Sequence, residues 1–200
     1  MEIQNLIFDF GGVLVDWNPR YLFGHLFEEE SEMEYFLANI CNDEWNLQQD
    51  AGRSLAEATA ILQKRFPAHA SMIHRYYHQW EEMIGGEISE NVCLLSALRK
   101  KYRLFGLTNW SGETFPIALR RFAFFKEFEG IVVSGDEKII KPDERIFHLL
   151  LDRYQLNAKS CLFIDDNLKN VNAAKAIGFH TIHLSYSVSL ENRFRQMGIV

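Results

Sequence analysis

Residues 6–14 read LIFDFGGVL, in which an apolar run stops at Asp9 and meets the pair Gly11 and Gly12. This pattern is typical of a short buried strand that is followed by a tight turn. The Asp9 carboxylate would then project from the end of the strand, beside backbone N–H groups that can hold an anion. An Asp that only caps a turn is the plainer alternative for this segment taken alone.

Four more apolar runs follow downstream, and we expect each to form a strand. They cover residues 103–107, 130–133, 161–164 and 180–184. Helical patterns lie over residues 89–101, 111–122, 142–154 and 167–177. Alternating strands and helices predict an α/β fold, with a parallel five-stranded sheet covered by helices on both faces. Open sheets of this kind bind ligands at the carboxyl ends of their strands.

Residues 16–86 break this alternation, because they show helical periodicity without a convincing strand. The expected helices are residues 21–27, 33–40, 55–66 and 70–84. We therefore predict an all-helical insertion at 16–86 and a core made of residues 1–15 and 87–200. Gly85 and Gly86 close the insertion, and their permissive backbone suits a hinge.

The composition is that of an ordinary globular chain: 200 residues, 48% hydrophobic and 24% charged. Its 21 basic and 27 acidic residues give a net charge of −6, which does not support binding to nucleic acid or to an anionic membrane. No apolar stretch approaches the roughly 20 residues that span a bilayer. The three cysteines show no disulfide or metal spacing, and the first residues do not resemble a signal peptide, so we expect a cytoplasmic protein.

Polar residues that suit phosphate and metal chemistry follow the other predicted strands. Thr108 and Asn109 offer a hydroxyl and an amide, and Lys141 precedes a helix start, where a cation can serve a bound anion. Asp165 and Asp166 repel each other unless a cation or hydrogen bonds compensate. Loop chemistry or a surface lysine would explain each feature singly, but their arrival at neighbouring strand ends favours one site.

Four segments together resemble the motifs of the haloacid dehalogenase superfamily over nearly the whole chain. They are FDFGGVL at 8–14, LTN at 107–109, KPD at 141–143 and FIDDN at 163–167. The resemblance implies a Rossmann-like core and a small helical cap, which corresponds to the insertion at residues 16–86. Within the family, the chain is similar to small bacterial sugar-phosphate phosphatases.

The resemblance implies a Mg²⁺-dependent phosphatase that acts on a small phosphomonoester, with a sugar phosphate as the first candidate. Asp9 would attack the phosphoryl group and become an aspartyl phosphate, which water then hydrolyses. The Asp9 carboxylate, the backbone carbonyl of Gly11 and Asp166 would hold Mg²⁺. Asp165 would coordinate through water or orient that shell.

Thr108, Asn109 and Lys141 would hold the transferring phosphoryl oxygens, and Lys141 would also neutralise Asp9. One position departs from the family pattern. Many phosphatases of the family carry a second Asp two residues after the nucleophile as a general acid, and this chain has Gly11 there. We therefore expect a slow enzyme, a substrate with a comparatively acidic leaving oxygen, or protonation by water.

Two alternatives stay open at this point. A 2-haloacid dehalogenase also lacks the second Asp and needs no Mg²⁺, but dehalogenases generally replace the acidic pair that Asp165 and Asp166 form here. The chain could also be a catalytically weak regulatory or binding member of the fold. Under any of these functions, we expect either a monomer or a homodimer. We expect substrate specificity to come from the cap, with these candidates: Trp17, Asn18, Arg20, Trp45, Gln48, Gln49 and Arg53.

Overall fold

The computed structural model describes residues 2–185 and 188–200, and a five-stranded parallel sheet forms its centre. The strand order is β5-β4-β1-β6-β7, and every neighbouring pair is parallel. The strands are β1 (Asn5–Phe8), β4 (Arg103–Thr108), β5 (Gly130–Val133), β6 (Cys161–Asp165) and β7 (His180–His183). The predicted α/β fold with a Rossmann-like sheet is therefore confirmed.

Helices cover both faces of the sheet, and the alternation along β1 shows why. Leu6 and Phe8 belong to one buried cluster and Ile7 to the other, because successive strand residues point to opposite faces. The face of Ile7 packs against α9 (Glu144–Tyr154) and α10 (Leu168–Ile177). The face of Leu6 and Phe8 packs against α6 (Ser89–Leu98), α7 (Phe115–Arg121) and α11 (Leu190–Gln196).

The register of the sheet brings the polar strand ends together. Phe8 of β1 is level with Gly106 of β4 on one side and with Ile164 of β6 on the other. The next residues along the chain, Asp9 and Asp165, therefore lie side by side at one edge of the sheet. This edge is where a parallel α/β sheet binds ligands.

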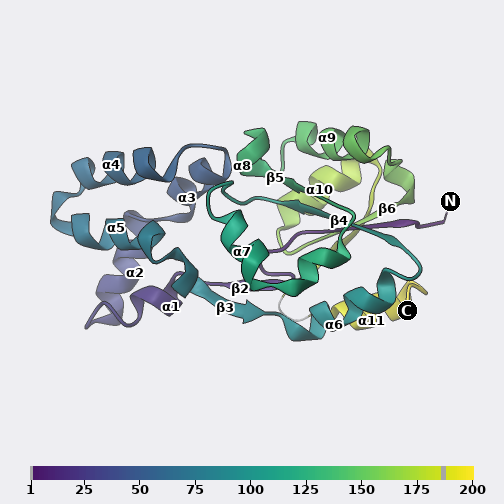
Figure 1. Cartoon of the computed structure of the whole chain (residues 1–200), viewed down its shortest axis with the longest axis horizontal. Helices are drawn as coiled ribbons and strands as arrows, with labels where there is room; N and C mark the ends of the chain where they lie inside the picture. The colour runs from purple at the N-terminus through teal and green to yellow at the C-terminus, as the bar shows by residue number, and fades with distance from the viewer. Residues whose placement is uncertain (1, 186–187) are drawn as a thin grey trace.

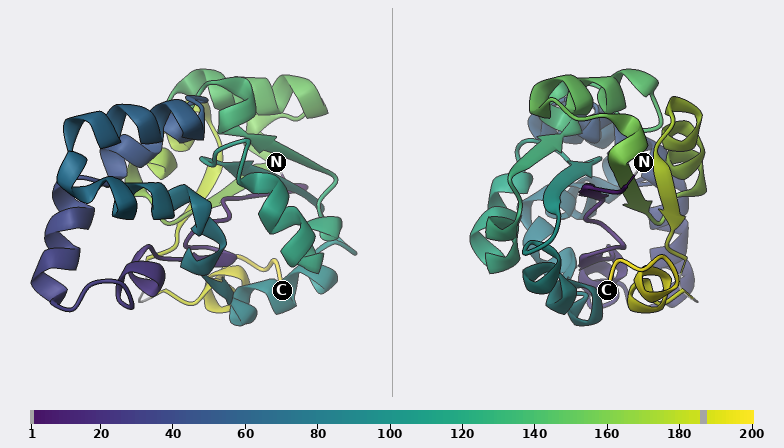
Figure 2. Two further views of the ribbon diagram at one scale, coloured as in Figure 1. Left: turned by 60° about the vertical axis from the view of Figure 1, so that its left-hand side comes forward. Right: turned by 90° about the vertical axis from the view of Figure 1, so that its right-hand side faces the viewer.

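Five helices of the insertion gather at one end of the molecule, away from both chain termini (Figures 1 and 2). They are α1 (Arg20–Phe23), α2 (Glu30–Asn39), α3 (Asp43–Asp50), α4 (Leu55–Arg65) and α5 (Ala70–His78). Helix α3 was not expected from the sequence, and α5 ends before the short 3₁₀ turn at Trp80–Met83 rather than continuing to residue 84. The division into a core and a cap at residues 16–86 stays a prediction.

Two short strands, β2 (Val15–Trp17) and β3 (Ile84–Glu87), carry the chain into and out of this group of helices. They pair antiparallel. No strand was expected here from the sequence, because β2 has three residues and β3 contains Gly85 and Gly86, which strands disfavour. Pairing with a segment about seventy positions away along the chain is what makes them strands, so the two glycines lie in a sheet rather than in a loop.

Three other elements differ from the expectation. Helix α7 begins at Phe115 rather than near residue 111. The single turn α8 (Ser134–Glu137) and the C-terminal helix α11 were not predicted. Helix α8 follows β5 directly, and it packs against α3 of the insertion. This contact joins the insertion to the ligand-binding edge of the sheet.

Candidate active site

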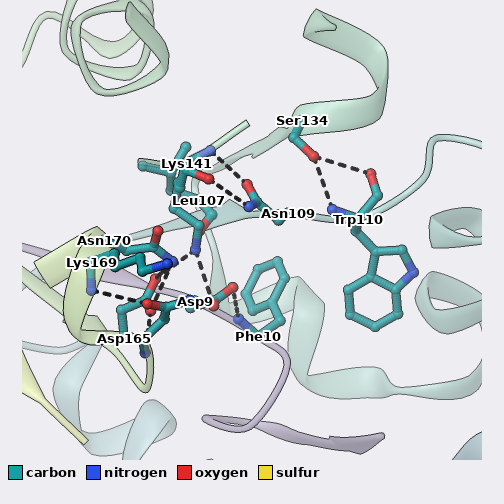
Figure 3. Close-up of polar contacts among 11 residues, drawn as sticks. Asp9, Phe10, Leu107, Asn109, Trp110, Ser134, Lys141, Asp165, Lys169 and Asn170 are labelled. Carbon is teal, nitrogen blue, oxygen red and sulfur yellow. Dashed lines mark hydrogen bonds and ion pairs between the residues drawn. The ribbon is translucent and has the colours of Figure 1, made fainter. Parts of the chain in front are cut away.

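A buried lysine, Lys141, lies between the carboxyl ends of the sheet strands, close to Asp9, Asp165 and Leu107 (Figure 3). The Nζ atom of Lys141 is 2.7 Å from Oδ2 of Asp165 and 3.0 Å from Oδ2 of Asp9, and it donates a hydrogen bond to the Leu107 carbonyl at 2.8 Å. Burial alone would lower the pKa of Lys141, but Asp165 and Asp9 outweigh it and raise that pKa above its ordinary value. The lysine is therefore charged and fixed between two carboxylates.

Asp9 is almost completely buried, with 8% of its surface exposed. One carboxylate oxygen accepts a hydrogen bond from the backbone N–H of Phe10 at 2.7 Å, and the other faces Lys141. Burial raises the pKa of Asp9 to about 7, since Lys141 offsets it only in part and Asp165 and Asp166 add to the rise. The site thus holds more negative charge than its single lysine neutralises.

The other two carboxylates have different surroundings. Asp165 is fully buried, and its oxygens accept hydrogen bonds from Lys141, from the side chain of Asn170 and from the backbone N–H of Asn167. Asp166 is exposed as a residue, but its carboxyl is partly buried, and this partial burial, followed by repulsion from Asp165, raises its pKa. Asp165 is therefore held by the protein, whereas Asp166 can reach a ligand.

Ligand oxygens of Asp9, Asp165 and Asp166 all lie within 4.8 Å of one another. Among the described residues this is the one such group of metal-binding side chains. Three carboxylates with one ammonium group suit a hard divalent cation, which prefers oxygen ligands and would offset the surplus charge. The donor set fits the metal site that the sequence predicted.

Thr108 ends β4 and Asn109 follows it, and the two side chains have different partners in the site. The buried hydroxyl of Thr108 has no hydrogen-bond partner among the described residues, so it is available to a ligand. The Asn109 amide donates to the carbonyl of Lys141 at 2.9 Å and accepts from the N–H of Lys141 at 2.8 Å (Figure 3). The Asn109 side chain thus fixes the backbone of the buried lysine.

The glycine pair after Asp9 has two different environments. Gly12 has a φ of +68°, and a side chain there would collide with the Asp166 carboxylate. The backbone of Gly12 therefore passes close to Asp166, one of the three clustered carboxylates. Gly11 has open space where a Cβ would stand, and it lines a cavity beside the site.

This cavity has a volume of about 130 Å³ and lies between the strand ends and the insertion. Aromatic side chains form much of its wall, namely Trp17, Tyr77, Trp80 and Trp110. Its polar lining comprises Asn46, Asp50, Asn109, Ser111 and Thr114. Burial raises the pKa of Asp50 to about 7, although a hydrogen bond from the backbone of Ser111 acts in the opposite direction.

The candidates for substrate specificity are spread over the insertion. Trp17 lines the cavity, and its buried Nε1 has no partner among the described residues. Arg20 pairs with Glu34 at the surface, and the Asn18 side chain accepts from the N–H of Arg20. Another hollow, away from the strand ends, is lined by Trp45, Gln48 and Arg53, while Gln49 bonds to Tyr77.

Three cavity residues, Asn46, Asp50 and Tyr77, were not predicted from the sequence. Asn46 and Asp50 lie on α3, whose helical pattern was not recognised, and Tyr77 reads as an ordinary aromatic residue of a helix. The signal that could have found Asp50 is its place one turn after Asn46, since residues four apart share a helix face.

The family described as haloacid dehalogenase-like hydrolase matches residues 6–184. The chain therefore belongs to this family and is a hydrolase, as its motifs predicted. It is 24% identical to a sesquiterpene phosphatase, astK, from Aspergillus oryzae, with 96% of this chain and 94% of that protein covered. It is also 24% identical to a phosphorylated carbohydrates phosphatase from Thermotoga maritima, with 90% of this chain and 84% of that protein covered.

Dehalogenases are relatives too. The chain is 24% identical to (S)-2-haloacid dehalogenase 1 from a Pseudomonas species, with 92% of this chain and 85% of that protein covered. Some curated relatives are much longer: the chain spans 34% of drimenol cyclase drtB from Aspergillus calidoustus. A solved HAD family enzyme from Bacteroides thetaiotaomicron, in a magnesium complex, has a TM-score of 0.76 at 22% identity, with 98% and 100% covered. This structural similarity shows that the two proteins share the same fold.

Proposed function

We propose that this protein is a Mg²⁺-dependent phosphatase that hydrolyses a small phosphomonoester through an aspartyl phosphate on Asp9. The observation that carries the proposal is the grouping of the Asp9, Asp165 and Asp166 carboxylates within 4.8 Å, with the Lys141 ammonium against Asp9. Phosphoryl transfer needs a nucleophile together with fixed positive charge around the transferring group. The phosphatases among the relatives support the same reaction.

Asp9 acts as the nucleophile, because its carboxylate stands at a strand end with one oxygen held by the N–H of Phe10. Lys141 orients the attacking oxygen and, with the free hydroxyl of Thr108, binds the phosphoryl oxygens. Asn109 fixes the backbone of Lys141, so its side chain acts by positioning that lysine. Water then hydrolyses the aspartyl phosphate and restores the Asp9 carboxylate.

The Asp9 and Asp166 carboxylates would hold the metal ion together with the backbone carbonyl of Gly11, the ligand that the family resemblance implies. Asp165, which bonds to Lys141 and Asn170, would orient these ligands. A bound Mg²⁺ supplies charge stabilisation for the phosphoryl oxygens. Asp166 is the one carboxylate of the three that is exposed, which leaves its oxygens free to coordinate.

We place the leaving group in the cavity beside Gly11, with residues 16–86 as the cap that closes it. Trp17 and Tyr77 of this segment line the same cavity as Gly11 and Asn109 of the core. Aromatic walls with a few polar groups suit a sugar ring, and the carbohydrate phosphatase of Thermotoga maritima supports a sugar phosphate. A prenyl phosphate is the competing ester, since another relative is a sesquiterpene phosphatase.

A 2-haloacid dehalogenase is the second candidate, because one relative has that activity. The acidic pair argues against it: a halide displacement at carbon has no use for a cluster that binds a divalent cation.

Cys41 and Cys161 are buried free thiols, which supports a reducing cytoplasm as the location. The described residues include no helix that is long and apolar enough to cross a membrane.

The test is phosphate release from a panel of sugar phosphates, farnesyl phosphate and 4-nitrophenyl phosphate, with Mg²⁺ or with EDTA. We expect turnover that requires Mg²⁺ and that is absent from Asp9→Asn. Chloride release from 2-chloropropionate is measured in parallel. Chloride release without phosphate release would assign the protein to the dehalogenases instead, and silence in both assays would leave the weak regulatory member as the better interpretation.

A further inference from the structure

Asp50 lines the cavity, and its carboxyl group has no role in the reaction proposed so far. It ends α3, and it lines the cavity together with Gly11, the position at which many phosphatases of the family carry their general acid. We propose that the Asp50 carboxyl protonates the leaving oxygen of the phosphate ester in place of the acid that is missing at Gly11. This inference rests on the proposed phosphatase function and adds a catalytic residue from the cap.

Direct contacts fix the C-terminal end of α3 to the core, beside the carboxyl ends of the sheet strands. The Ser134 hydroxyl donates to the backbone carbonyl of Asp50 at 2.6 Å, and it accepts from the N–H of Trp110 at 3.0 Å. The turn after α3 also packs tightly: Gly52 has a φ of +95°, and a Cβ there would meet Gly135 and Lys138 of the core. Asp50 is thus fixed beside residues 109–111, which follow β4.

The carboxyl itself faces the core. The backbone of Ser111 lies near enough to this carboxyl to lower its pKa, against the effect of burial, and Ser111 lines the cavity as well. Asn109, two residues earlier, lines the same cavity and binds the backbone of Lys141. Asp50 therefore lines the same cavity as Gly11 and Asn109, the residues that adjoin Asp9 and Lys141 at the strand ends.

Burial of the Asp50 carboxyl favours its uncharged, proton-bearing form, and the hydrogen bond from the Ser111 backbone opposes this only in part. Tyr76 and Tyr77 of α5 are the titratable groups that face it. Arg53 directs its guanidinium to Gln49 and to the Trp45 carbonyl instead. Asp136 of α8 lies against Gly112, and Lys138, which follows α8, packs against Gly52.

Burial is the main cause that raises the pKa of Asp50, to about 7. A proton donor serves best when its pKa lies near the working pH. At neutral pH a large share of the protein therefore carries the proton that the leaving oxygen needs.

The proton balance closes over one turnover. Asp9 attacks phosphorus, the bond from phosphorus to the leaving oxygen breaks, and that oxygen takes its electron pair together with the Asp50 proton to leave as an alcohol. Asp50, now a carboxylate, then accepts a proton from water as that water attacks the aspartyl phosphate. The bond from phosphorus to Asp9 breaks, inorganic phosphate leaves, and both carboxyl groups return to their starting forms.

The experiment compares wild type with Asp50→Asn on phenyl, 4-nitrophenyl and 2,4-dinitrophenyl phosphate, whose leaving oxygens become progressively less basic while the ring stays similar. We expect a loss of about 10²-fold or more in kcat/KM, which reports the steps up to formation of the aspartyl phosphate, on phenyl phosphate, and little loss in kcat/KM on the dinitrophenyl ester, whose leaving oxygen needs no proton. With phenyl phosphate, the wild-type kcat/KM should also fall above pH about 7, and this fall should be absent from the variant.

Asp43→Asn is the matched control, because Asp43 is an exposed acid at the start of the same helix. It should behave as wild type on all three esters. Equal losses on the three esters, or no loss on any, would overturn the role of Asp50 while leaving the phosphatase proposal in place. Failure of the wild type to hydrolyse even the dinitrophenyl ester in an Asp9-dependent way would instead overturn the phosphatase proposal, and the role of Asp50 with it.

Discussion

The Nζ atom of Lys141 lies 3.0 Å from the Asp9 carboxylate, and the lysine side chain is fully buried. Breaking a buried ion pair by removing one partner leaves an uncompensated charge, which costs about 3–5 kcal/mol in typical proteins. Lys141→Met leaves Asp9 and Asp165 without their cation. We therefore expect a loss of stability in that range and no phosphatase activity.

Urea unfolding in EDTA measures the stability of Lys141→Met, since no bound metal ion then replaces the missing charge. Lys101→Met, which removes an exposed lysine, is the control and should unfold with the wild type. An unchanged midpoint for Lys141→Met would mean that the two carboxylates find other compensation and that the lysine is not the centre of the site.

Asp9→Asn should abolish phosphate release, because the amide cannot act as the nucleophile. The substitution keeps the shape of the side chain, so we expect near-UV circular dichroism to match that of the wild type. Asp152→Asn, an exposed acid on α9, serves as the control for the assay. Substantial phosphatase activity in purified Asp9→Asn would remove Asp9 as the nucleophile.

A metal ion that binds only the folded chain raises the free energy of unfolding, by about 2.7 kcal/mol at a hundredfold excess over its Kd. For a protein of this size each kcal/mol corresponds to roughly 2–4 °C in Tm. We expect Mg²⁺ to raise the Tm of wild type and not that of Asp166→Asn, measured by thermal unfolding. A variant that responds to Mg²⁺ as the wild type does would place the ion elsewhere.

The sheet and most of the site could be predicted from the sequence because their signals are local. Each strand is an apolar run, and Asp9, Thr108 and Asp165 directly follow or end such runs, so parallel packing had to bring them to one edge. The pairing of β2 with β3 and the docking of Asp50 through Ser134 depend on contacts between segments far apart in the chain. No local pattern encodes those contacts, and so the cavity and its acid emerged only from the structure.

The pKa of Asp50 also predicts how stability changes with pH. The folded chain keeps the Asp50 proton up to about pH 7, whereas a carboxyl with its ordinary pKa of 3.8 releases it in the unfolded chain. Between these pH values the folded state binds more protons, so Asp50 makes the free energy of unfolding fall as the pH rises. Asp50→Asn should therefore have a higher Tm than wild type at pH 8, by about 2–4 °C for each kcal/mol relieved, and a similar Tm near pH 4. Thermal unfolding at the two pH values checks this, and a Tm difference that does not depend on pH would contradict the raised pKa.

Gly11 offers a way to restore a general acid in the Asp50→Asn background. A Cβ at Gly11 meets no atom within 4 Å, and Gly11 lines the cavity, so this position has open space where an Asp side chain would begin. If Asp50 protonates the leaving oxygen, Gly11→Asp combined with Asp50→Asn should recover about 10²-fold or more of the lost rate on phenyl phosphate. Gly12→Asp is the matched control, because its side chain would collide with Asp166 and should give no recovery. If the double variant folds as the wild type does and stays as slow as Asp50→Asn, then a missing proton is not what limits Asp50→Asn.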